Sequence, residues 1–212
     1  MRSPLAERSR ARLIEAMLPD VPFDGWTRPA LRAAARRLDM PEEEAIALFP
    51  RGASDLVAAF SRWADLQMLA RLAKEEAASL SLSRRVALAL RLRFELLLPW
   101  REAVRRGLSI LAMPQNAPLA LPLLYDTVDA MWHGVGDRST NFGFYTKRAT
   151  LAAIQAAATL YWLDDRSPDF ADTQAFIERR LDHLHRFGRL RADFAAVAER
   201  LPNPFRLLRP LR

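Results

Sequence analysis

The sequence has no cysteine among its 212 residues and only three histidines. Without cysteine the chain forms neither a disulfide framework nor a thiolate site, which fits a reducing compartment. His183 and His185 are two residues apart on a predicted helix, so they point to different sides and make a poor metal pair. No glycine-rich phosphate loop, nucleophile elbow or metal-ligand cluster occurs either. We therefore predict no enzymatic activity, no cofactor and no metal.

Long hydrophobic runs are also missing. The longest apolar stretch, about residues 151–163, is interrupted by Gln155 and is too short to span a bilayer. Residues 1–18 lack the apolar centre of a secretory signal. We therefore expect a soluble chain.

Two pairs of polar residues have the spacing of possible sites. Asp129 and His133 are four residues apart and can share a helical face, but no third ligand follows at matching spacing, so a solvent-side or capping pair is expected. Asp164 and Asp165 could be paired carboxylates. Adjacent acids before a Ser-Pro helix start are more typical of loop and capping interactions.

Positive charge is concentrated at the ends of the chain. The formal net charge is +7, and the last 27 residues hold seven basic and two acidic side chains, whereas residues 41–185 are nearly neutral. This distribution favours a localised contact with an anionic surface over general binding of polyanions.

Helical periodicity dominates the sequence, with almost no alternating strand pattern. It predicts an all-α fold. Thr27 is an expected N-cap with Pro29 in the first turn, and Ser167 with Pro168 repeats this arrangement. The predicted helices span residues 27–38, 41–49, 53–79, 83–98, 100–112, 119–133, 142–163 and 168–186.

The first three helices have the lengths and spacing of a helix-turn-helix unit, which raises the hypothesis of a DNA-binding repressor. The helix that would enter the major groove begins with Glu42, Glu43 and Glu44, and residues 41–49 contain no Lys or Arg. These carboxylates oppose phosphate contacts, whereas acids in a first helical turn favourably meet the helix dipole. Four arginines of the preceding helix could grip phosphates or simply form a solvated face: Arg28, Arg32, Arg36 and Arg37. We predict that nucleic acid is not a partner.

Residues 129–148 join two apolar helical patterns through a turn of Gly, Asp and Ser. Five aromatic-type side chains lie there beside charges: Trp132, His133, Phe142, Phe144 and Tyr145. Exposed aromatic surface rimmed with charge is typical of a docking site. The alternative is a turn whose aromatic side chains fold back into the core.

This run, with residues 103–118 and 164–173 around it, resembles the signature of the ubiquinone-biosynthesis accessory lipid-binding proteins, which share the fold of TetR-type regulators. The resemblance covers about residues 80–182 well and the ends in outline. The family usually has Asp at the position of Asn141 and often Trp at the position of Phe144.

The resemblance implies a non-catalytic, dimeric protein that binds an isoprenoid quinone precursor at the membrane and presents it to the di-iron demethoxyubiquinone hydroxylase. It implies a helix-turn-helix-like unit over residues 1–52, a lipid-binding and dimerisation domain over 53–187 and a membrane-binding tail over 188–212. The expected location is the cytoplasmic face of the inner membrane in a bacterium, or the matrix side in a eukaryote. The alternative is a TetR-like ligand-sensing transcriptional repressor.

For the hydroxylase, the resemblance implies a partner-binding patch. Its residues are Met131, Trp132, Asp137, Phe144, Tyr145 and Arg148.

For the lipid, helices that are apolar around more than one face can line an interior, although an ordinary filled core has the same pattern. The predicted lining residues are Leu108, Leu111, Met113, Leu119, Leu123, Leu124, Met131 and Ile154. The alanine-rich helix after Tyr145 suits a dimer interface, or close packing inside one chain.

The tail combines apolar residues with arginines. Its predicted membrane-binding residues are Leu190, Phe194, Val197, Leu201, Phe205 and Leu208. A basic amphipathic segment of this kind can lie in a membrane interface. The alternative is a helix packed on its own body.

Overall fold

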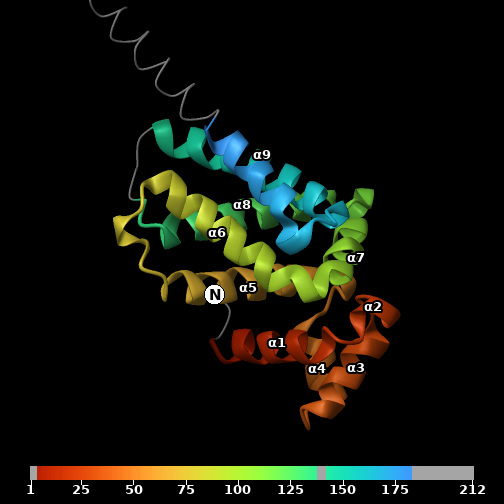
Figure 1. The fold of residues 1–212 in the computed structure, drawn as a ribbon. Helices are drawn as coiled ribbons and strands as arrows, with labels where there is room; N and C mark the ends of the chain where they lie inside the picture. The colour runs from red at the N-terminus through yellow and green to blue at the C-terminus, as the bar shows by residue number, and fades with distance from the viewer. Residues whose placement is uncertain (1–3, 138–141, 183–212) are drawn as a thin grey trace, which may run out of the picture.

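The computed structural model describes residues 4–137 and 142–182, and within those ranges the chain forms helices and turns without a strand (Figure 1). The all-α fold expected from the sequence is confirmed. The helices form two groups: α1 to α4 gather on one side of α5, and α6 to α9 on its other side (Figure 1).

The first group begins with a helix that the sequence analysis did not delimit. It buries Leu13, Ile14 and Met17 on one face. The predicted cap at Thr27 is confirmed, because Thr27 Oγ1 accepts a hydrogen bond from the Ala30 amide at 3.4 Å. The bounds are α1 (Pro4–Met17), α2 (Val21–Asp24), α3 (Arg28–Arg37) and α4 (Glu42–Leu48).

The second group surrounds the interior in which the candidate site lies. Its helices are α5 (Ala53–Leu72), α6 (Leu82–Leu97), α7 (Arg101–Leu111), α8 (Ala117–Gly134) and α9 (Phe142–Asp164). The prediction that the helix from Ala53 reaches about Ser79 is wrong. The polar run Lys74-Glu75-Glu76 offers no apolar side chain to bury, and the chain turns there before a short 3-10 turn at Ala77–Ser79.

The last described helix also differs from the prediction. A 3-10 turn over Pro168–Phe170 comes first, and residues 171–182 are helical after it. Asp169 and Phe170 have φ values of 50° and 47°, in the left-handed region, which interrupts a helix that would begin at Pro168. Ser167 still caps the helix, since its Oγ accepts from the Asp172 amide at 3.0 Å. Residues 183–186 of the prediction lie outside the described residues.

Helix α5 joins the two groups through its buried aromatic side chains. The rings of Trp26 and Phe60 lie 4.9 Å apart, and Trp63 Nε1 donates to Glu15 Oε1 of α1 at 2.9 Å. Gly52 precedes α5 with φ 63°, a left-handed conformation that favours glycine and turns the chain from α4 into α5. One apolar core therefore runs across the predicted boundary between residues 52 and 53.

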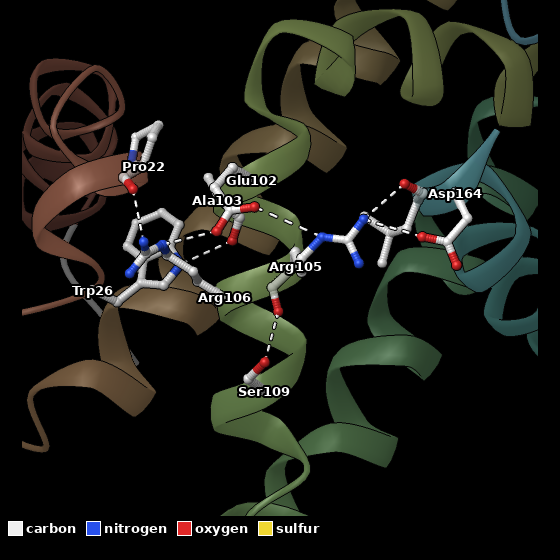
Figure 2. A network of polar contacts seen from close by, with 9 residues as sticks. Pro22, Trp26, Glu102, Ala103, Arg105, Arg106, Ser109 and Asp164 are labelled. Atoms are coloured by element: carbon white, nitrogen blue, oxygen red, sulfur yellow. Dashed lines mark hydrogen bonds and ion pairs between the residues drawn. The ribbon is translucent and has the colours of Figure 1, made fainter. Parts of the chain in front are cut away.

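Helix α7 is held from both sides (Figure 2). Towards the first group, Trp26 Nε1 donates to the Ala103 carbonyl at 3.0 Å, and Arg106 donates to the Pro22 carbonyl at 2.7 Å. Towards the end of α9, Arg105 donates to a main-chain carbonyl at 2.9 Å. These contacts fix the face that α7 turns to the interior.

Among the described residues, no single helix has the length and apolar character needed to cross a membrane; the helical stretches Leu82–Leu111 and Pro114–Gly134 meet that test only together, with a bend of 93° between them. Within the same residues, no group of three or more His, Asp or Glu side chains could hold a metal ion.

Candidate functional site

A cavity of about 430 Å3 lies between helices α5, α6, α7, α8 and α9. Its walls are mostly apolar, which is typical of a site for a small hydrophobic molecule. The lining residues are Val57, Phe60, Ser61, Arg93, Leu97, Val104, Gly107, Leu108, Leu111, Ala112, Ala120, Leu123, Leu124, Thr127, Gln155, Ala156, Thr159 and Leu160.

Small residues leave this space where the helices face one another. Ala120 of α8 and Ala156 of α9 line the cavity with single methyl groups. At Gly107, α7 lies close to α5 and Trp26: a Cβ atom there would be in ordinary van der Waals contact, 3.5 Å from Val57 Cγ1 and 3.6 Å from Trp26 Nε1. These helices therefore enclose a cavity and still pack closely beside it.

Four of the eight predicted lipid-lining residues line the cavity: Leu108, Leu111, Leu123 and Leu124. The other four do not. Met113 lies after α7 and is 44% exposed, Leu119 is half-buried beside the lining residue Ala120, and Met131 and Ile154 are buried in the core. Consecutive helical residues point about 100° apart, so a residue next to the edge of the lining face, such as Leu119 or Ile154, can turn away from the cavity.

The polar part of the wall was not predicted from the sequence. Arg93 is 7% exposed, and its Nε donates to Asp65 Oδ1 at 3.0 Å. Thr127 Oγ1 donates to Asp65 Oδ2 at 3.0 Å and lies 3.4 Å from Ser61 Oγ. Burial raises the pKa of Asp65, against the opposing effects of Arg93 and Thr127. The members of this cluster are far apart in sequence, so they come together only where α5, α6 and α8 pack against one another.

Helix α9 contributes two polar lining residues, Gln155 and Thr159. Gln155 is 3% exposed, and its Nε2 donates to Thr159 Oγ1 at 3.2 Å. Its Oε1 is buried and has no hydrogen-bond partner among the described residues. A buried acceptor without a partner costs roughly 1–3 kcal/mol, so a bound donor at this position would be favourable.

The described residues of the predicted partner-binding patch do come together at the end of α8 and the start of α9. Lys147 Nζ lies 5.7 Å from the centre of the Trp132 ring and 3.3 Å from Asp137 Oδ1. Arg148 Nε donates to Asp129 Oδ1 at 2.7 Å.

The exposure of this patch differs from the expectation of an aromatic docking surface. Met131 is 0% exposed, Arg148 2% and Trp132 8%. For Trp132 the alternative is therefore correct, since its ring folds back into the core. Phe144 and Tyr145 belong to α9, but their side chains lie outside the described residues.

The two candidate polar pairs have the structural roles that the sequence favoured. His133 Nδ1 lies 3.2 Å from Asp129 Oδ2 on the surface. Asp165 accepts from the amides and hydroxyls of Ser167 and Thr173. Burial alone would raise the pKa of Asp165, but these hydrogen bonds lower it to about 2.

On the helix-turn-helix-like unit, the acidic first turn of α4 pairs with the arginines of α3. Arg36 Nη1 lies 2.6 Å from Glu42 Oε1, and Arg32 Nε lies 3.3 Å from Glu42 Oε2. Glu43 and Glu44 are exposed. The position of a recognition helix is therefore acidic, and the adjacent arginines are partly neutralised.

An apolar surface covers the outer faces of α8 and α9. Its large members are Leu121 (74% exposed), Tyr125 (45%), Leu160 (63%) and Tyr161 (43%). The alanines predicted for a dimer interface divide between two environments: Ala149, Ala153 and Ala157 are exposed, Ala152 and Ala156 are half-buried, and Ala158 is buried. The predicted membrane-binding residues, Leu190 to Leu208, lie outside the described residues.

A second hollow, of about 530 Å3, lies between α6 and residues 174–182. Charged side chains from both elements line it, including Arg84, Arg91, Glu178 and Asp182. Its chemistry does not suit an apolar ligand, so the cavity between α5 and α9 is the candidate site.

Comparison with known proteins identifies similar chains. A family profile named COQ9 matches residues 117–188, which include α8 and α9. The chain is 36% identical over 205 residues to the human mitochondrial ubiquinone biosynthesis protein COQ9, covering 92% of this chain and 63% of the human protein. It is 34% identical over 200 residues to COQ9-B of Xenopus laevis, covering 91% of this chain and 68% of that protein. The chain thus spans somewhat less than two thirds of the human relative.

A solved structure supports the fold. A TetR transcriptional regulator from Nitrosomonas europaea superposes with a TM-score of 0.64 at 20% sequence identity, covering 83% of this chain and 97% of the regulator. The TetR-type fold expected from the resemblance is therefore confirmed. At this identity the likeness concerns the fold alone.

Proposed function

Because the chain belongs to the COQ9 family of ubiquinone biosynthesis proteins, we propose that it binds an isoprenoid quinone precursor and presents it to the di-iron demethoxyubiquinone hydroxylase. Its role in ubiquinone biosynthesis follows from the family. Lipid binding, presentation and action without catalysis of its own belong to the proposal.

The cavity between α5 and α9 carries the proposal. It is lined mainly by aliphatic and aromatic side chains, and a prenyl chain gains free energy by leaving water for such a wall, at about 25 cal/mol per Å2 of apolar area. A volume of about 430 Å3 accommodates part of a prenylated ring compound, within the usual range of ligand sites. Leu108 and Leu111 of α7, with Leu123 and Leu124 of α8, would contact the chain.

The end of α8 and the start of α9 would receive the hydroxylase. There, Arg148 bound to Asp129 and Lys147 bound to Asp137 fix the two helices against each other. Buried Met131, Trp132 and Arg148 would act by shaping this surface. Phe144 and Tyr145 complete the patch that the family resemblance implies.

Membrane association and dimerisation complete the proposal. The basic tail from Leu190 would lie in the membrane interface as a peripheral anchor, and the apolar outer faces of α8 and α9 would meet a second copy of the chain. The human relative is named as a mitochondrial protein, which is consistent with the matrix side of the inner membrane.

A DNA-binding repressor is not favoured, although the fold is shared with one. Phosphate contacts supply most of the affinity for DNA. Here the carboxylate of Glu42 pairs with Arg32 and Arg36, so these arginines are less available to phosphates. Glu43 and Glu44 face solvent at the start of α4.

The test is the lipid content of the protein purified without detergent from a ubiquinone-producing host. We expect mass spectrometry of the organic extract to find a prenylated quinone or its precursor in stoichiometric amount. Ala156→Phe places a ring inside the cavity and should abolish most of this lipid. Ala157→Phe adds the same ring on the exposed side of α9 and should leave the lipid content unchanged. A wild-type protein free of lipid, or equal lipid in both variants, would contradict the proposal.

For the hydroxylase, Tyr145→Ala should weaken its association with the protein in a pull-down. Phe23→Ala removes an aromatic ring that is 84% exposed on α2 and serves as the control. Equal retention of the hydroxylase by both variants would remove the patch from the proposal and leave lipid binding standing.

A further inference from the structure

We propose that the polar end of the cavity binds the hydroxyl group of a prenylated phenol or hydroquinone, while the apolar end holds the prenyl chain. This inference rests on the proposed function, since it specifies the chemical class of lipid that the same cavity accepts. The carrier role requires only an apolar wall, whereas this subsite requires particular polar residues.

Four of the polar lining residues, Ser61, Arg93, Thr127 and Gln155, lie towards one end of the cavity, and the hydroxyl of the fifth, Thr159, donates back to the Gln155 carbonyl. Along α8 the lining runs from Ala120 through two leucines to Thr127, and along α9, in the opposite chain direction, from Leu160 to Gln155. On α6 it runs from Leu97 back to Arg93. Ser61 of α5 joins this end through its contact with Thr127.

Arg93 and Gln155, which both line the cavity, offer a ligand a donor and an acceptor. Arg93 uses Nε for Asp65 and Nη2 for Ser61, and Nη1 takes part in none of the hydrogen bonds of the described residues. Gln155 Oε1 is a buried acceptor without a partner there. A phenolic hydroxyl can accept from a guanidinium and donate to an amide oxygen. An ether or a quinone carbonyl can only accept.

The charge of the subsite excludes an anionic head group. Asp65 lies 3.0 Å from Arg93 and neutralises it, and Thr127 donates to the same carboxylate. A phosphate or carboxylate ligand would add an uncompensated negative charge in a buried place, which is unfavourable. A neutral hydroxyl adds none.

The polar end also faces the predicted partner-binding patch. Thr127 precedes Trp132 by about 8 Å along α8, and Gln155 follows Arg148 by about 10 Å along α9. Leu151, which is buried, lies between Gln155 and Arg148 on α9, and buried Met131 of the patch follows Thr127 by about one helical turn on α8. A bound ring would therefore point towards the surface proposed for the hydroxylase, with its prenyl chain directed away from it.

Three probes with the same chain test the subsite on the full-length protein: 2-geranylphenol, its methyl ether and geranylbenzene. Tryptophan fluorescence titration gives each dissociation constant. The wild-type protein should bind the phenol at least about five-fold more tightly than the ether, and the ether more tightly than the hydrocarbon. In Gln155→Leu the difference between phenol and ether should vanish, while the affinity for geranylbenzene should persist.

Leu108→Ala at the apolar end is the matched control, and it should weaken all three probes by a similar factor. Equal binding of the three probes by the wild-type protein would overturn the subsite and leave the carrier function intact. Binding of none of them would contradict the proposed function itself. If Gln155→Leu still prefers the phenol to the ether, this preference comes from other residues, and the role of Gln155 is overturned. The wild-type comparison decides for or against the subsite even if Gln155→Leu does not fold.

Discussion

Arg93 and Asp65 show that burial decides how much stability is lost when one partner of an ion pair is removed. Both residues are less than 10% exposed and are joined by a 3.0 Å contact between α6 and α5. Two positions before Arg93, Arg91 pairs with Glu95 at 2.6 Å, but Arg91 is more than half exposed. Removing one partner leaves an unpaired buried charge in the first case and an unpaired but hydrated charge in the second.

We expect Arg93→Met to lower the free energy of unfolding by about 3–5 kcal/mol, and Arg91→Met by at most about 1 kcal/mol. Urea denaturation of the two variants measures the difference. The double change Asp65→Leu with Arg93→Met removes both charges and should recover much of the loss. Equal destabilisation by the two single variants would refute the buried-pair interpretation.

At the scale of elements, Asp165 organises the junction between α9 and the helix over residues 171–182. Its Oδ1 accepts from Ser167 and its Oδ2 from Thr173, so one carboxylate fixes the turn before the helix begins. These bonds require the ionised form, which is why the pKa of Asp165 falls to about 2 in spite of burial. In the unfolded chain an aspartate has a pKa near its ordinary value of about 3.9.

The stabilisation that this junction contributes should therefore depend on pH. Because the folded pKa lies below the unfolded one, the stabilisation is present above about pH 4 and is lost as pH falls through about 2. It amounts to roughly 2 kcal/mol. The free energy of unfolding of the wild type should exceed that of Asp165→Asn by this amount at pH 6 and by much less at pH 2, as measured by urea denaturation. A difference that does not change with pH would exclude this linkage.

For the whole molecule, the outer faces of α8 and α9 leave large apolar side chains uncovered. Leu121 and Leu160 are each more than 60% exposed. Isolated apolar residues are ordinary on surfaces, but several large ones on two helices that pack together are typical of an interface. A second copy of the chain is the occupant that the family resemblance implies.

We expect the wild-type protein to sediment as a dimer and Leu121→Glu to sediment as a monomer, because burying a carboxylate against apolar side chains is unfavourable. Leu5→Glu changes a leucine of similar exposure on α1, 72% against 74%, and should remain dimeric. Analytical ultracentrifugation distinguishes the two. A monomeric wild type, or a dimeric Leu121→Glu, would show that this face has another occupant.

The sequence by itself determined the all-α class, the caps at Thr27 and Ser167, the acidic start of α4 and the family, because these depend on periodicity and on residues close together in the chain. Half of the lining residues that it predicted do line the cavity, Leu108 and Leu123 among them. Only the tertiary structure decided which face of each helix meets the cavity, since leucines of core and cavity look alike in sequence. It alone joined Ser61, Arg93, Thr127 and Gln155, and it buried Trp132, because both outcomes depend on how distant helices pack.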